Sequence, residues 1–394
     1  MRIIYLLASL GSGGAERVVS LLANRMCEDG HDIQIVCLKY NDVYYTLHDK
    51  IKVVAATDHT SNRLSELFWL RKYIQKEKPD VVIPFTEGVY CFTILALLGT
   101  RIPIIASERL DPAAMSLPRK FLKRLLLPYA DWLVVQTESI KAYFPKRIQK
   151  KTSVIYNPVN DEAFENPRMD SRVQSSKRKR ADSYDHSGHD FCHNSSKQTS
   201  LTDLVAPKIQ SSKQNRIISV ARLYPQKNQK MMIEAFSKIA DEFPDWQLVI
   251  YGEGPLRSSL ELLVKSLQLE GRVLLPGRTE HVIEELRKSK IFCLSSDYEG
   301  MSNSMIEAIC VGLPIITTKV SGTEELITNG ENGYAVDKGD SEGLCSKMRE
   351  LIKDKEKRTL FGEKSIPLAY KFRLDVIVGE WENLIARCKE YKSS

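Results

Sequence analysis

The chain has 394 residues, 43% of them hydrophobic and 27% charged, which is enough for two domains of ordinary size with separate cores. No apolar run approaches the ~20 residues that span a bilayer, and the opening MRIIYLLASLGSGG predicts a buried strand rather than a signal peptide. The eight cysteines are scattered without a C-x-x-C pair, which disfavours disulfides and a zinc site and is typical of a cytoplasmic protein.

Residues 1–165 alternate short apolar runs with amphipathic stretches. The runs, rich in Ile and Val, are RIIYLLAS, DIQIVCL, IKVVAA, DVVIPF, IPIIAS, WLVVQT and TSVIYNP. Helical patterns lie between them at ERVVSLLANRMCEDG and LSELFWLRKYIQKEK. Buried strands separated by amphipathic helices predict a parallel sheet covered on both faces, so this part is predicted to be a Rossmann-like α/β domain.

Residues 166–214 interrupt this pattern and hold more than half of the formal net charge of +7. They are rich in Ser, Lys, Asp and His, which predicts a disordered or inserted linker. KRKR could be a nucleic-acid patch, but a short charge run in a linker is usually only solvated, so no nucleic-acid partner is expected. HSGHDFCH offers four possible metal ligands, yet it lacks a second ligand pair, so no metal site is predicted; the four are His186, His189, Cys192 and His193.

Residues 215–368 repeat the α/β alternation, beginning with RIISVARL and continuing through WQLVIYGEGP, GRVLLPGR, KIFCLSS, PIITT and GYAV. A second doubly wound domain is therefore predicted. Two such domains in tandem enclose a cleft, and ligands of parallel sheets bind outside the carboxyl ends of the strands. The fold class is predicted to be α/β, with two Rossmann-like domains facing across a cleft.

The first candidate motif is GSGGAER, at the junction of the first strand and first helix. Its glycines let a ligand approach the backbone, and the helix N-terminus offers amides to an anion. A dinucleotide fingerprint would need Gly or Ala where Glu16 stands, so NAD binding is disfavoured. A tight turn without any ligand remains the alternative.

The second motif is SVARLYPQKNQ, which follows the first strand of the second domain. Arg222 and Lys227 are five positions apart across a loop that leads into a helix at about Asn228. An arginine fork and a lysine point charge together suit a diphosphate. The alternative is two solvated cations near a helix start.

The third motif is DYEGMSNSMIEAICVGLPII, with Glu299 and Glu307 eight positions apart. Ser302 or Asn303 is expected to cap a helix that runs to about Val311, which leaves free amides at its start. Such a helix end suits phosphate oxygens, and carboxylates accept hydrogen bonds from sugar hydroxyls, so a nucleotide sugar is the predicted ligand. Otherwise the glutamates are exposed loop and helix residues.

The E-x7-E spacing in EGMSNSMIE, with GGAE near the N-terminus and R-x4-K opening the second domain, resembles the family 4 glycosyltransferases. This resemblance covers both domains and implies the GT-B fold and retention of anomeric configuration. It implies that Glu307 binds the donor ribose, that Glu299 lies beside the donor sugar as a catalytic residue, and that Arg222 and Lys227 hold the diphosphate. The other implied donor-binding residues are Gly13, Gly14, Gly252, Gly254, Gly277, Arg278, Asn303, Ser304 and Met305.

Two positions depart from the family pattern. Ser302 stands where many members have Pro, and ASERLDP replaces a loop that often carries a catalytic-site His. The latter is similar to the subgroup acting on polyprenyl-diphosphate-linked bacterial glycans, often with N-acetylgalactosamine or a related hexose as the donor sugar. On this resemblance Glu108 is a candidate catalytic residue, and the acceptor-binding candidates are Glu16, Arg109 and Asp111.

The predicted reaction needs no metal and no cofactor beyond the nucleotide-sugar substrate, because the two cations and the helix amides would stabilise the departing diphosphate. The chain contains no D-x-D motif, with which other sugar transferases hold a metal. The family resemblance implies that the acceptor hydroxyl attacks from the leaving-group face. The alternatives are a GT-B sugar-nucleotide epimerase and a non-catalytic nucleotide- or sugar-binding protein.

SLPRKFLKRLLLPYAD, residues 116–131, interleaves basic and apolar residues. This pattern indicates either a helix on an anionic membrane surface or a core helix with snorkelling cations. The first interpretation favours a lipid-linked glycan over a free one as acceptor and a peripheral position on the cytoplasmic face of the inner membrane. Residues 369–394 form a helical pattern that, by resemblance to GT-B proteins, crosses back onto the N-terminal domain with Trp381 at the interface.

Overall fold

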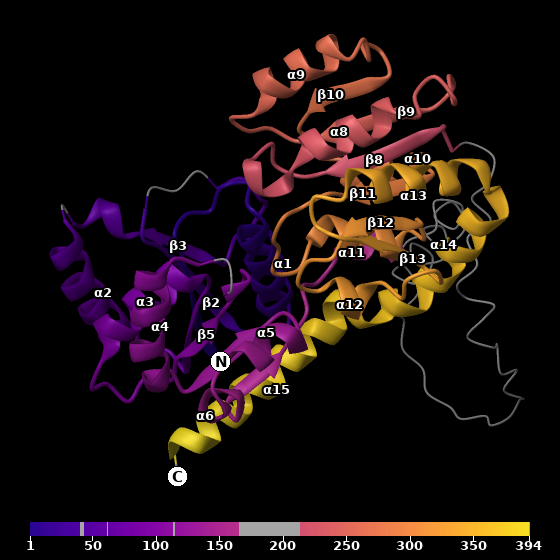
Figure 1. Cartoon of the computed structure of the whole chain (residues 1–394). Helices are drawn as coiled ribbons and strands as arrows, with labels where there is room; N and C mark the ends of the chain where they lie inside the picture. Colours follow the sequence, from indigo (N-terminus) through magenta and orange to yellow (C-terminus); the bar gives the residue numbers. More distant parts are fainter. Residues whose placement is uncertain (40–42, 61, 113–114, 165–212, 394) are drawn as a thin grey trace, which may run out of the picture.

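The computed structural model describes residues 1–394 except 40–42, 61, 113–114, 165–212 and 394, so KRKR and HSGHDFCH lie outside the described residues. Figure 1 shows two α/β halves, joined at the seam near α1 and by the long last helix. The predicted fold class, two doubly wound domains with parallel sheets, is confirmed.

The N-terminal domain contains two short parallel sheets, which isolated bridges between Val82 and Ile104 and between Phe85 and Ser107 connect edge to edge. The first has the order β3-β2-β1-β4 and is built from β1 (Arg2–Leu7), β2 (Asp32–Cys37), β3 (Lys52–Ala55) and β4 (Val81–Pro84). The second has the order β5-β6-β7 and is built from β5 (Ile105–Ser107), β6 (Trp132–Val135) and β7 (Thr152–Val154). The described helices of the N-terminal domain are α1 (Gly14–Glu28), α2 (Arg63–Glu77), α3 (Glu87–Leu97), α4 (Leu117–Leu126), α5 (Glu138–Tyr143) and α6 (Lys146–Gln149), with 3₁₀ turns at Ala56–Asp58, Leu127–Tyr129 and Asp161–Phe164.

The C-terminal domain has one six-stranded sheet of order β10-β9-β8-β11-β12-β13. The strands are β8 (Arg216–Val220), β9 (Gln247–Tyr251), β10 (Val273–Gly277), β11 (Ile291–Leu294), β12 (Ile315–Thr318) and β13 (Gly333–Val336). The helices are α8 (Gln229–Ser237), α9 (Arg257–Ser266), α10 (Val282–Lys288), α11 (Asn303–Cys310), α12 (Thr323–Leu326), α13 (Ser341–Lys353), α14 (Lys355–Ala369) and α15 (Leu374–Ser393), with 3₁₀ turns at Pro225–Lys227 and Tyr370–Phe372.

Apolar cores cover both faces of each sheet. Successive side chains of a strand point to opposite faces and so enter the two cores alternately. In β1, Ile3, Tyr5 and Leu7 belong to one apolar core, whereas Ile4 and Leu6 belong to the core on the opposite face. This is why the strands are continuous apolar runs rather than alternating ones.

The last helix, α15, packs on the N-terminal domain and not on the sheet that precedes it (Figure 1). Its Trp381 is fully buried and stacks on Phe85, with ring centroids 6.0 Å apart. The helix begins at Leu374, so the first residues of the predicted crossing segment instead end α14 and form the turn Tyr370–Phe372. The chain therefore passes between the domains twice, once after β7 and once before α15.

No helix in the described part of the chain is long and apolar enough to cross a membrane.

Candidate functional site

The glycine turn places the N-terminus of α1 at the seam, the surface along which the two domains touch. Gly13 is the N-cap, and a side chain at this position would overlap the Glu16 carboxylate, which folds back over the helix start. Burial raises the pKa of Glu16, while a bond to its own backbone amide and the nearby Arg222 lower it. The positive end of α1 thus already holds a carboxylate, beside a cation from the other domain.

The Arg222 loop begins where β8 ends. Arg222 is exposed with its guanidinium 5.0 Å from the centre of the Tyr224 ring, and Lys227 is half-buried just before α8. Two glycines of the neighbouring loop pack directly on this segment: a side chain at Gly252 would collide with the Ala221 carbonyl, and one at Gly254 with the Leu223 carbonyl. These two glycines hold the Arg222 loop in place; their predicted contact with the donor stays a prediction, as does that of the exposed Arg278.

Glu299 is only 6% exposed and is held by two donors. Lys227 pairs with its Oε1 atom, and the Ser296 hydroxyl donates to the same atom at 2.6 Å. The residues predicted to act at the diphosphate and at the reacting centre are therefore in direct contact, even though 72 positions separate them in the chain.

Helix α11 starts at Asn303 with Ser302, one of the two predicted caps, as its N-cap. The Met305 amide, predicted to bind the nucleotide sugar, instead donates to the Ser302 hydroxyl at 3.4 Å as part of the helix cap. Asn303 and Ser304 are half-buried at the tip of the helix. Serine does at this position what the N-cap requires, which accounts for its replacing the Pro of many family members.

Glu307 lies one turn inside α11 and is 2% exposed. Arg17 of α1 pairs with its carboxylate across the seam. Burial raises the pKa of Glu307, and the charge and hydrogen bond of Arg17 lower it. Sequence reasoning did not single out Arg17; the available signal was a cation directly after the glycine turn in GGAER, one residue from Glu16.

The two helix N-termini meet at this seam. The Asn303 side chain donates to the Gly14 carbonyl at 3.3 Å and accepts from Asn157. Asn157 in turn accepts from Arg109 at 2.7 Å and from Gln136 at 2.8 Å. The predicted cleft is therefore closed at these points, and the positive ends of α1 and α11 face each other.

The ASERLDP loop is largely turned into the N-terminal domain. Glu108 is fully buried, where it pairs with Lys123 at 2.6 Å and accepts from Tyr90 at 2.9 Å. Arg109 is buried over the Phe85 ring, and burial lowers its pKa to about 9. Both side chains are buried, as are those of Glu299 and Glu307, so the predicted catalytic role of Glu108 and acceptor contact of Arg109 stay predictions. Asp111 is half-buried, and its predicted acceptor contact stays a prediction.

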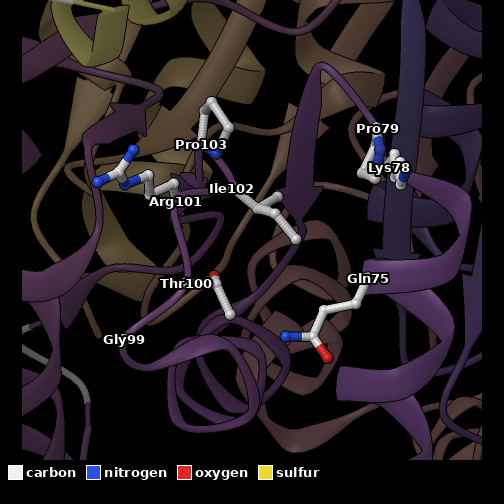
Figure 2. Close-up of a pocket in the computed structure, with 8 residues that line it drawn as sticks. All are labelled: Gln75, Lys78, Pro79, Gly99, Thr100, Arg101, Ile102 and Pro103. Atoms are coloured by element: carbon white, nitrogen blue, oxygen red, sulfur yellow. The ribbon is translucent and has the colours of Figure 1, made fainter.

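A separate hollow of about 360 Å³ lies in the N-terminal domain (Figure 2). It is lined by Gln75, Lys78, Pro79, Gly99, Thr100, Arg101, Ile102 and Pro103, just before β4 and β5 begin. This is the amino edge of the sheet, opposite to the edge at which parallel sheets bind their ligands, so we assign no function to it.

Two protein-family models match the chain. The model described as Glycosyltransferase Family 4 matches residues 12–163, and the model described as Glycosyl transferases group 1 matches residues 203–366. The chain is 27% identical to the GalNAc-α-(1→4)-GalNAc-α-(1→3)-diNAcBac-PP-undecaprenol α-1,4-N-acetyl-D-galactosaminyltransferase of Campylobacter jejuni, over 99% of each chain.

A second Campylobacter jejuni protein, the N-acetylgalactosamine-N,N'-diacetylbacillosaminyl-diphospho-undecaprenol 4-α-N-acetylgalactosaminyltransferase, is 25% identical over 92% of this chain and 93% of its own. Among solved structures, Anabaena HepE in complex with UDP and glucose superimposes with a TM-score of 0.76 at 17% identity, covering 98% of this chain and 99% of HepE. This likeness establishes the predicted GT-B fold.

Proposed function

Because the chain belongs to the family 4 and group 1 glycosyltransferases, we propose that it moves a hexose from a UDP-sugar to a polyprenyl-diphosphate-linked glycan, retaining the anomeric configuration. One observation carries this proposal. The N-terminus of α1 in one domain meets the N-terminus of α11 in the other, where Arg17 of the first domain pairs with Glu307 of the second, and the Lys227–Glu299 pair lies just before α11.

The leaving group explains why this arrangement suits sugar transfer. When the bond to the sugar breaks, negative charge develops on the nucleoside diphosphate. Arg222, Lys227 and the amide ends of α1 and α11 would stabilise that charge. Glu307 would accept hydrogen bonds from the ribose, and Glu299 would lie beside the sugar as it is transferred.

Metal independence is part of the proposal, because the cations of the chain are positioned to do the work of a metal in other transferases. Retention is also part of the proposal. Transfer from an α-linked donor into the α-linkages named in the relatives keeps the anomeric configuration. The proton of the acceptor hydroxyl would pass to the departing phosphate oxygen. No cofactor is needed in this scheme.

The donor and acceptor are inferred from the relatives. Both Campylobacter jejuni relatives are N-acetylgalactosaminyltransferases whose names contain undecaprenol-linked diphosphate glycans, and the HepE structure contains UDP. We therefore propose UDP-N-acetylgalactosamine first among UDP-hexoses, and a lipid-linked acceptor. The enzyme would work at the cytoplasmic face of the inner membrane, which suits the seven described cysteines, all of them buried.

The test is calorimetric titration of the purified protein with UDP, GDP and ADP in the presence of EDTA. We expect UDP alone to bind tightly, with at least about tenfold weaker binding in both Lys227→Ala and Glu307→Ala. Lys230→Ala is the matched control, because Lys230 is an exposed cation near the start of α8, the helix that follows Lys227.

Transfer is then measured with UDP-N-acetylgalactosamine and a polyprenyl-diphosphate-linked glycan, and the anomeric configuration of the product is read by NMR. An inverted product would contradict retention, and activity lost in EDTA would contradict metal independence. Binding of UDP without transfer to any acceptor would favour the non-catalytic alternative, and donor conversion without acceptor would favour the epimerase.

A further inference from the structure

Helix α4 presents its apolar side chains to solvent. Leu117, Phe121 and Leu125, spaced four residues apart along one side of the helix, are 80%, 72% and 57% exposed. Leu122 and Tyr129 extend this surface and are also exposed. The residue buried at the centre of the helix is Lys123, paired with Glu108. The helix therefore buries a charge and Leu126 and exposes its other apolar side chains, which does not fit the core-helix interpretation.

The charge around this surface has one sign. Helix α4 contains no acidic residue, and the guanidinium-bearing Arg119 and Arg124 are both exposed. Arg124 follows Phe121 by one turn and so borders the apolar stripe. An exposed apolar stripe bordered by an arginine, on a helix without acidic residues, is the pattern of a helix that lies in the interface of an anionic bilayer.

Neighbouring helices extend this side of the domain. Helix α3 packs against both α2 and α4, and the three lie next to one another in Figure 1. Leu64 and Phe68 of α2 are exposed as well, at 73% and 62%. Helix α2 of the same domain thus also exposes apolar side chains.

We propose that the α4 face, defined as Leu117, Phe121, Leu122, Leu125, Tyr129 and Arg124, docks on an anionic lipid bilayer. A second copy of the chain is a poorer occupant. A two-fold symmetric contact would set the arginines of each copy against those of the other, whereas phosphate headgroups complement them.

Docking of this face would link the bilayer to the site. The buried Lys123 connects α4 to Glu108, and the adjacent Arg109 donates to Asn157 at the seam. A bilayer under α4 would therefore rest against the helix that Lys123 ties to the loop beside the seam, and a lipid-linked glycan would approach the site from that bilayer. This last step rests on the proposed function; the docking itself does not.

The experiment is co-sedimentation of the full chain with phosphatidylcholine vesicles, with and without phosphatidylglycerol. We expect binding that needs phosphatidylglycerol and that falls at least about tenfold in Phe121→Glu/Leu125→Glu. Arg124→Gln should weaken it about fivefold at low salt, with a smaller effect at high salt. Leu262→Glu is the matched control, because Leu262 is an equally exposed leucine on α9 of the other domain.

Thermal melting and UDP titration of the same variants separate docking from folding and from donor binding. Unchanged melting and UDP affinity with lost vesicle binding would support the proposal even if no transfer were ever detected. Equal binding to neutral vesicles, equal loss in Leu262→Glu, or a wild-type dimer that Phe121→Glu/Leu125→Glu dissociates would each overturn it.

Discussion

At the scale of single residues, the contact between Arg17 and Glu307 has the largest consequences. A carboxylate as deeply buried as Glu307 is costly to ionise unless a cation compensates it. Arg17 provides that cation from the other domain. The charged form of the residue predicted to bind the donor ribose is therefore favoured by a contact that a bound ribose would have to share, although burial still raises the pKa of Glu307 overall.

We expect Arg17→Ala to destabilise the protein increasingly as the pH rises. Glu307 has a folded pKa above its ordinary 4.5, so the folded chain binds this proton more tightly than the unfolded chain. Stability is then lost as the pH rises from that ordinary value through the folded pKa. Removing Arg17 raises the folded pKa further, so the loss should reach about 3 kcal/mol at pH 8 and be small near pH 4.5.

Melting temperatures between pH 4.5 and pH 8 check this expectation. Adding Glu307→Gln to Arg17→Ala should abolish the pH dependence, since a neutral amide needs no counter-charge. Arg25→Ala on the same helix removes only an exposed pair with Asp29 and should cost less than about 0.5 kcal/mol at any pH. A pH-independent loss in Arg17→Ala would mean that Glu307 does not depend on Arg17.

At the scale of elements, the orientation of α4 depends on one buried ion pair. Lys123 and Glu108 are both inaccessible to solvent, so neither can be removed alone without leaving an unpaired buried charge. The pair determines which side of α4 faces inward, and with it which side carries the exposed leucines and Phe121.

Lys123→Met should lower the free energy of unfolding by about 3–5 kcal/mol, and Lys123→Met/Glu108→Gln should recover most of that loss. Chemical denaturation measures both. The double variant also tests the predicted catalytic role of Glu108: we expect transfer activity close to that of the wild type. A folded double variant whose turnover had fallen by about 10²-fold or more would confirm Glu108 as a catalytic residue.

Helix α3 shows where sequence periodicity fails at this scale. Its sequence EGVYCFTILAL is apolar on nearly all sides, and the helix lies buried between α2 and α4. Without a polar face there is no 3.6-residue pattern to detect, so the sequence predicts no helix at these residues. The half-exposed helices α1 and α2 do carry polar faces, and their expected ranges agree closely with the structure.

At the scale of the whole molecule, Gly300 of the C-terminal domain packs tightly against the N-terminal domain. A side chain at Gly300 would overlap the Arg109 carbonyl and the Gln136 side chain, both in the other domain. Gly300→Ala should therefore leave each domain intact and hold the two apart. Because Arg222, Lys227 and Glu307 all belong to the C-terminal domain, we expect UDP affinity to change by less than about threefold and transfer to fall at least about tenfold.

Small-angle scattering of Gly300→Ala should show a larger radius of gyration than the wild type. Gly379→Ala is the control, because a side chain there meets open space on α15 and should raise helix stability slightly. Unchanged scattering with full activity would mean that the closed seam is not needed for transfer.

The sequence by itself determined the strands, several of the helices, the two-domain organisation and the three motifs, because apolar periodicity and loop chemistry are local properties. It also indicated that Arg222, Lys227, Glu299 and Glu307 act at one site. Only the tertiary structure decided that Arg17 pairs with Glu307 and that Lys123 faces inward while Phe121 faces solvent. These depend on contacts between residues distant in the chain, and the burial of a side chain is a property of everything packed around it.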